Sequence, residues 1–112
     1  MPNSGLTIVA RRLREARERK GLSQKALGIA AGIDEFSASP RVNQYERGKH
    51  TPDLLTLKNF ADVLSVPVPY FFAEDDVLAD ILELLHALPR SEWPVVKKYL
   101  ARKTASLPEA DV

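Results

Sequence analysis

Apolar residues recur at three- and four-residue spacing along most of the chain, and this spacing predicts helices with one buried face. The first such segment, residues 8–20, is expected to form an amphipathic helix. It should end at Gly21 in a left-handed C-terminal cap. Ser23 is then expected to act as the N-cap of a short second helix that ends at Gly32. Two helices therefore meet at a glycine turn.

The segment after Gly32 has no clear period until Ser39 and Pro40, which have the form of an N-cap followed by proline at the first helical position. We expect a third helix to begin there and to end at Gly48. Asp53 is expected to cap a fourth helix with a regular apolar stripe. The proline-interrupted segment 66–72 is expected to form a short fifth turn or helix that places aromatic side chains on the core.

Residues 76–88 contain more large apolar residues than a helix with one modest buried stripe requires, so this helix is expected to have two neighbours. Pro89 ends it, and Ser91 is predicted to cap a last helix with one apolar and one basic face. The expected organisation is a domain at 1–74, a C-terminal helical extension at 75–103 and a flexible tail at 104–112.

The composition fits one folded domain with an appendage. The 112 residues are 45% hydrophobic and 28% charged and include no cysteine, which excludes disulfides, thiolate metal sites and cysteine nucleophiles. No apolar run approaches the ~20 residues that span a bilayer, and we expect a cytoplasmic protein.

Charge is distributed unevenly along the chain, although the net charge is only +1. Residues 1–60 contain 11 Lys and Arg against 6 Asp and Glu, whereas residues 61–112 contain 5 against 9. A basic first half joined to an acidic second half is expected if one surface meets phosphates and another meets solvent or protein.

An ordered set of motifs runs through this pattern: Gly21-Leu22-Ser23-Gln24, the turn glycine Gly32, Tyr45-Glu46-Arg47-Gly48 with a following Pro52, and the leucine-patterned fourth helix. Over residues 8–72 the chain resembles the phage-repressor-like helix-turn-helix regulators of the Cro/cI or XRE type. The resemblance implies an all-α, five-helix domain, here followed by a C-terminal helical hairpin. It also implies sequence-specific binding to double-stranded DNA, as a transcriptional repressor that acts as a homodimer on an operator.

Two positions depart from the family pattern. Gly28 stands where the family usually has alanine, which costs about 1 kcal/mol of helix propensity but permits close helix contact. The apolar residue of the recognition helix, Val42, lies ten residues after Gly32 instead of six. The four extra residues, within 34–40, lengthen either the turn or the recognition helix, and the sequence leaves both open.

Candidate DNA-reading residues lie on the third helix, which would enter the major groove. Gln44 matches a base-reading position of the family and can bind adenine through two hydrogen bonds, whereas the serines are equally suited to capping. The full base-reading set is Gln44, Arg41, Asn43, Ser39 and Ser37.

Residues near predicted helix ends are suited to contact the DNA backbone. These are Gln24, Lys25, Arg47, Lys49 and His50. The resemblance also implies that Arg17 and Glu46 form a partly buried ion pair between the first and third helices, with a structural role.

The C-terminal helices carry an apolar surface that is predicted to mediate dimerisation through Leu78, Ile81, Leu82, Leu85, Trp93, Val96 and Leu100. The alternative is that these helices pack within the chain. A dimer would present two modules to half-sites ~34 Å apart.

No catalytic, metal or cofactor site is expected, because the chain lacks phosphate-binding and nucleophile motifs and its two histidines are far apart. The alternative function is a protein-interaction module of antitoxin or regulator-binding type, in which the acidic C-terminal helices engage another protein and DNA binding is secondary.

Overall fold

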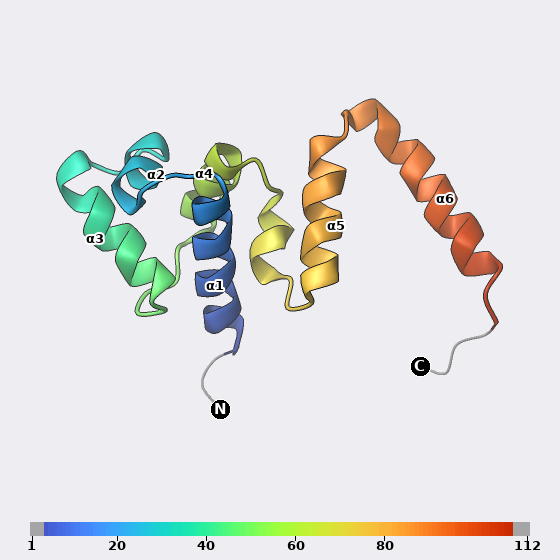
Figure 1. Ribbon diagram of the computed structural model, residues 1–112, viewed down its shortest axis with the longest axis horizontal. Coiled ribbons are helices and arrows are strands. Elements are labelled where there is room, and N and C mark those ends of the chain that lie inside the picture. Colours follow the sequence, from blue (N-terminus) through green and yellow to red (C-terminus); the bar gives the residue numbers. More distant parts are fainter. Residues whose placement is uncertain (1–3, 109–112) are drawn as a thin grey trace.

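The computed structural model describes residues 4–108, and every regular element in that range is a helix, which confirms the predicted all-α class. The elements follow in the order α1 (Ser4–Arg19), α2 (Gln24–Ala30), α3 (Glu35–Glu46), α4 (Leu54–Leu64), the 3-10 helix η1 (Val68–Phe72), α5 (Asp76–Ala87), the 3-10 helix η2 (Arg90–Glu92) and α6 (Trp93–Ala105) (Figure 1). None of these helices has both the length and the apolar composition needed to cross a bilayer.

The predicted caps of the first helices are confirmed. The Ser23 hydroxyl accepts a hydrogen bond of 2.9 Å from the backbone N–H of Ala26, and the Asp53 carboxylate accepts one of 2.8 Å from Thr56. Gly21 and Gly32 have φ values of 75° and 94°, a backbone conformation that glycine adopts without strain. These residues fix where α1, α2 and α4 begin or end.

The core lies between α1–α4 and η1, and we call these five elements the N-terminal body. Leu13, Leu27, Val42, Phe60 and Phe71 are completely buried there. Tyr45 packs edge to face on Phe60, with ring centroids 5.9 Å apart. As expected for residues 66–72, η1 buries Tyr70 and Phe71, although Phe72 is exposed.

Helix α5 packs on the N-terminal body. Ala79 is buried in the core and Leu82 packs against it, while Asp75 caps the helix through the N–H groups of Val77 and Leu78. Three ion pairs join α5 to α1: Arg19 to Glu83 at 3.1 Å, Arg11 to Asp76 at 3.3 Å and Arg12 to Asp76 at 3.0 Å. The inner side of α5 therefore follows the predicted alternative of packing within the chain.

Arg12 is a buried charge between α1 and α5 that the sequence analysis did not identify as such. Its side chain is only 4% exposed, donates from Nε to the Ala73 carbonyl at 2.8 Å, and pairs with Asp76 at 3.0 Å. The guanidinium also lies over the Tyr70 ring. These partners compensate the cost of removing the charge from water.

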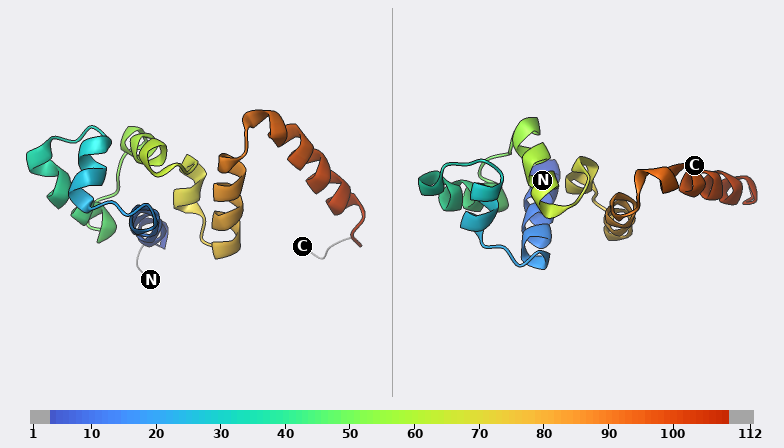
Figure 2. Two further views of the ribbon diagram at one scale, coloured as in Figure 1. Left: turned by 45° about the horizontal axis from the view of Figure 1, so that its top comes forward. Right: turned by 90° about the horizontal axis from the view of Figure 1, so that it is seen from above.

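Helix α6 projects away from the N-terminal body. The turned views agree that it diverges from α5 and lies at the opposite end of the molecule from α3 (Figure 2). It contains no buried residue. Its main attachment is the 3-10 turn η2 together with a hydrogen bond of 3.0 Å from Trp93 Nε1 to the Leu85 carbonyl.

Two predicted boundaries in this region need correction. Ser91 does not cap α6, because it lies inside η2, which runs directly into the helix without a side-chain cap. Thr104 and Ala105 belong to α6, so the helix extends into the predicted tail. Residues 109–112 of that tail lie outside the described part of the chain.

Candidate nucleic-acid interface

The helix-turn-helix unit is formed by α2, the turn at Gly32 and α3. The two helices approach closely at Gly28 and Ala38, where a Cβ atom added to the glycine would lie 2.7 Å from the alanine Cβ. Glycine at this position therefore allows a helix contact that a larger residue would push apart. The departure from the family pattern at Gly28 has a packing reason.

The recognition helix begins earlier than predicted. Helix α3 starts at Glu35, and its N-cap is Asp34, whose carboxylate accepts a hydrogen bond of 3.0 Å from the Phe36 N–H. The predicted start at Ser39 and Pro40 is wrong, because Ala38 is completely buried against α2 and anchors an additional turn. The four extra residues thus lengthen the recognition helix rather than the turn.

Pro40 consequently lies inside α3. Proline has no N–H, so it cannot donate the helix hydrogen bond to the Phe36 carbonyl, and its presence weakens the helix at this point. Burial of Ala38 and Val42 on one side and the Asp34 cap at the end act against that cost. The helix-start signal of Ser39 and Pro40 is therefore overridden by the packing of Ala38 and Val42 in the core.

The predicted base-reading residues all lie on α3, with different exposure. Gln44 is exposed on the side away from the core, whereas Ser37, Ser39 and Asn43 are partly buried. Arg41 is exposed at the side of the helix, where its Nη2 donates to the Tyr45 hydroxyl at 3.0 Å. Of this set, Gln44 is thus the residue whose side chain is both exposed and directed away from the core.

The structure brings Arg17 and Glu46 together. Two guanidinium nitrogens of Arg17 contact the Glu46 carboxylate, one at 3.0 Å, and Nη1 donates to the Leu22 carbonyl at 2.8 Å. The Glu46 side chain is only 3% exposed. The hydrogen bond to Glu46 raises the pKa of Arg17 further above its ordinary value, so Arg17 stays charged and ties α1 to α3.

The side chain of Gln24 belongs to the same network. Its Nε2 donates to Glu46 at 3.1 Å and to Asn43 at 3.3 Å, so the amide links the start of α2 to the end of α3. The side-chain amide that was predicted to contact the DNA backbone is therefore occupied by contacts within the protein.

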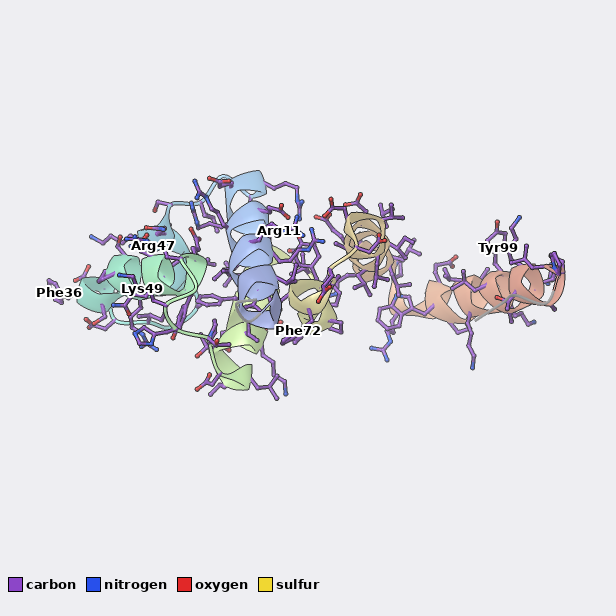
Figure 3. The ribbon with its side chains drawn as sticks, turned by 90° about the horizontal axis from the view of Figure 1, so that it is seen from below. Arg11, Phe36, Arg47, Lys49, Phe72 and Tyr99 are labelled. Atoms are coloured by element: carbon purple, nitrogen blue, oxygen red, sulfur yellow. The ribbon has the colours of Figure 1, made fainter. Side chains whose placement is uncertain are left out.

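The remaining predicted backbone-contact residues lie near the C-terminal end of α3, and we call them the basic rim. Figure 3 shows Arg47 and Lys49 close to α3, with Phe36 at its far end. Gly48, with φ of 73°, turns the chain there, and the Lys49 N–H donates to the Gln44 carbonyl at 3.0 Å. The rim comprises the exposed side chains Lys25, Arg47, Lys49 and His50.

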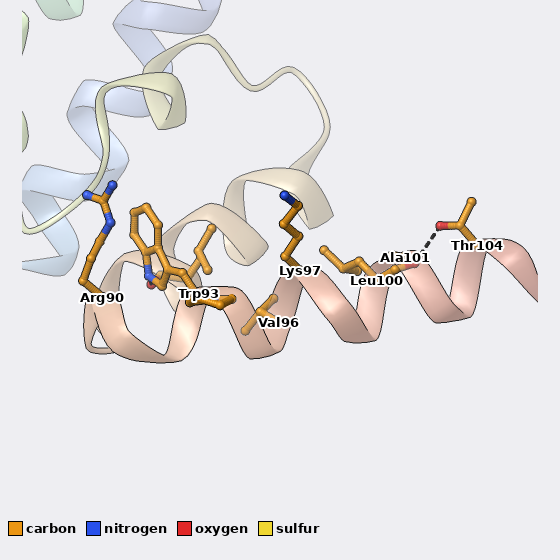
Figure 4. A pocket seen from close by; sticks show the side chains of 9 residues that line it. Arg90, Trp93, Val96, Lys97, Leu100, Ala101 and Thr104 are labelled. Carbon is orange, nitrogen blue, oxygen red and sulfur yellow. Dashed lines mark hydrogen bonds between the residues drawn. The ribbon is translucent and has the colours of Figure 1, made fainter.

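The predicted dimerisation residues separate into two environments. Leu82 and Leu85 are partly buried, and Leu82 packs on the core of its own chain. Leu78 and Ile81 are exposed on α5. On α6, Trp93, Val96 and Leu100 line an open groove of about 720 Å³ together with Leu85 (Figure 4).

Comparison with known proteins connects this geometry to a family. A family profile described as helix-turn-helix domain matches residues 8–69. Two curated proteins, each named an uncharacterized HTH-type transcriptional regulator, come from Sinorhizobium medicae (strain WSM419) and Rhizobium meliloti (strain 1021). Each is 33% identical over 73 residues, which cover 65% of this chain and 50% of the relative. The chain thus spans about half the length of these relatives.

A solved structure resembles nearly the whole chain. The crystal structure of the transcriptional regulator BswR aligns with a TM-score of 0.72 and 43% sequence identity, and the alignment covers 88% of this chain and 93% of BswR. The similarity therefore extends beyond the helix-turn-helix unit into the C-terminal helices.

Proposed function

Because the chain belongs to the helix-turn-helix domain family of transcriptional regulators, we propose that it is a repressor that binds an operator in double-stranded DNA as a homodimer. The observation that carries this proposal is the two-sided character of α3. Its inner side is buried through Ala38, Val42 and Tyr45, while Gln44 is exposed on the other side, near the basic rim. A rigid helix with an exposed polar side is suited to the major groove.

Gln44 is proposed to read a base, and the other polar side chains of α3 to support it. An amide can pair with N6 and N7 of adenine at once, a pattern that the other base pairs do not offer in the major groove. Arg41 can reach guanine or a phosphate from the side of the helix, and Ser37, Ser39 and Asn43 are the further candidates.

The basic rim is proposed to hold the DNA backbone. Lys25 lies in the first turn of α2, which Gln24 links to the end of α3, and Arg47, Lys49 and His50 follow that same end. The four side chains therefore lie near the C-terminal end of the helix that would enter the groove. Contacts of this kind set the orientation of a protein on DNA but do not distinguish sequences.

Substitution of Gln44 tests the reading function. Duplexes selected from a random pool by the full chain would be titrated by fluorescence anisotropy with the wild type and Gln44→Ala. We expect a loss of about 1–3 kcal/mol on the selected duplex and little change on a shuffled one. Equal losses on both duplexes would contradict base reading by Gln44, and the absence of saturable binding by the wild type at low salt would contradict DNA binding altogether.

The homodimer is proposed to form through α5 and α6. Within the described residues nothing covers the apolar side of α6, which lines an open groove together with Leu85 of α5, and α5 also exposes Leu78 and Ile81. Charge favours a second copy as the occupant: α5 carries the exposed Asp80, which makes no ion pair within the described residues, whereas α6 carries Lys97, Lys98, Arg102 and Lys103. An α6 helix laid across the α5 of another copy would bring opposite charges together.

This arrangement has a consequence for the operator. Helices α3 and α6 lie at opposite ends of a molecule 54 Å long, so a dimer joined at α5 and α6 holds its two α3 helices far apart. We therefore expect half-sites separated by about two turns of the duplex, ~68 Å, rather than by one turn.

A charged residue in the apolar surface tests the dimer. Ile81 is half-exposed, so Ile81→Glu should leave the fold intact but should yield a monomer in sedimentation equilibrium. The matched control is Leu55→Glu, an exposed leucine on α4, which should leave the mass of the dimer unchanged. An Ile81→Glu dimer would contradict the proposed surface. A wild type that remains monomeric at high concentration would favour the alternative, in which these helices bind another protein.

A further inference from the structure

The additional turn of α3 carries an aromatic side chain that the proposed function leaves unexplained. Phe36 is 86% exposed, more than any other large apolar side chain that the structure describes. It is the second residue of α3, and its backbone N–H is held by the Asp34 cap. An aromatic ring held on a capped helix and almost fully exposed is available to contact a partner.

Phe36 lies on the same side of α3 as Gln44. Residues four apart follow one another along a helix face, so Phe36, Pro40 and Gln44 form one row. All three are exposed, whereas Ala38, Val42 and Tyr45 face the core. Figure 3 shows Phe36 extending from the end of α3, away from the other helices. The ring therefore lies in the same row as Gln44, about two helical turns nearer the start of α3.

The charges around Phe36 disfavour a phosphate contact at this end of α3. Asp34 and Glu35 are exposed acidic residues beside it, and they would repel the DNA backbone. The edges of base pairs carry no net charge, and thymine presents a C5-methyl group in the major groove to which an apolar side chain can bind. An aromatic ring preceded by acidic residues is therefore better suited to the floor of the groove than to its walls.

We propose that Phe36 determines sequence specificity by packing its ring against the C5-methyl group of a thymine. The inference rests on the proposed DNA binding and adds a second reading position to it. Gln44 follows Phe36 by eight residues, about 12 Å along the helix axis. With base pairs about 3.4 Å apart, the thymine lies about three to four base pairs from the pair that Gln44 reads.

Removal of single methyl groups from the DNA tests this contact. A single half-site taken from the selected duplexes would be synthesised with each thymine in turn replaced by deoxyuridine, and affinities would be measured for the full chain. We expect the affinity of the wild type to fall about fourfold when one particular methyl group is absent. This is the change in affinity that corresponds to the free energy of burying one methyl group. Phe36→Ala should bind the thymine and deoxyuridine duplexes equally, whereas Phe36→Leu should keep part of the preference.

Phe72→Ala is the matched control, because it removes another exposed phenylalanine, located on η1 far from α3, and should retain the full fourfold preference. A wild type insensitive to every methyl group overturns the inference, as does a Phe36→Ala variant that keeps the preference. Uniform weakening of Phe36→Ala on all duplexes also overturns it, and would assign the ring to a protein contact or to the fold. In these cases DNA binding and the Gln44 effect still stand. If the wild type binds no duplex, the proposed function and this inference fall together.

Discussion

The N-terminal body and α6 bury apolar residues to very different extents. In the body, Leu13, Leu27, Phe60 and Phe71 are completely buried, and ion pairs and caps fix the ends of the helices. Helix α6 has apolar residues at helical spacing as well, but none of them is buried. A helix of 13 residues is marginal in water without tertiary packing. We infer that the body is stable by its own contacts and that α6 depends on a partner.

The largest expected effect contrasts one residue from each region. Phe60→Ala leaves a cavity in the core and should lower the free energy of unfolding by about 3–5 kcal/mol at any protein concentration. Leu100→Ala should have little effect in dilute solution and a growing effect as the protein associates, because binding to the folded state stabilises it. Urea denaturation at several concentrations would measure both. A Leu100→Ala loss independent of concentration would show that α6 packs on its own chain.

A smaller effect should separate the basic residues of the two regions. Lys49 lies in the basic rim, so Lys49→Ala should weaken binding to all DNA sequences. It should also reduce the slope of log affinity against log salt concentration by about one, because one fewer counterion is released on binding. Lys98→Ala on α6 should leave this slope unchanged on a single half-site, because its proposed partner is the acidic α5 of a second copy. Equal changes in slope for Lys49→Ala and Lys98→Ala would show that α6 also contacts DNA, and the two regions would then not differ in this function.

Much of the body could be predicted from the sequence because its signals are local. Ser23 and Asp53 cap helices where the pattern places them, and Gly21 and Gly32 end helices with the left-handed backbone expected. Each of these features depends on residues within one turn of the helix end. The association of Arg17 with Glu46 came from the family resemblance, since the two residues are far apart in sequence.

The start of α3 could not be predicted in the same way. Ser39 and Pro40 form a valid start signal, but the contact of Ala38 with Gly28 on another helix overrides it. The burial of Arg12 likewise depends on backbone carbonyls near residue 73, which no spacing rule relates to α1. The exposure of α6 depends on what covers it, which is a property of an assembly rather than of local sequence.

The smallest predicted effect concerns α5, which lies between the two regions. Hydrogen bonds from Arg12 and Arg11 lower the pKa of Asp76, so its ionised form is favoured in the folded chain. Its contribution to holding α5 on the body is therefore complete above the ordinary carboxyl pKa and is lost as the pH falls through the lowered value.

Asp76→Asn should speed hydrogen exchange of the α5 amides relative to wild type near neutral pH, with the difference disappearing in strong acid. Asp62→Asn on α4 is the control, since Asp62 is exposed, makes no ion pair within the described residues and should leave α5 exchange unchanged. If Asp76→Asn leaves exchange unchanged at neutral pH, the ion pairs of Asp76 do not hold α5 on the body, and its attachment rests on the packing of Ala79 and Leu82 and on the Arg19–Glu83 pair.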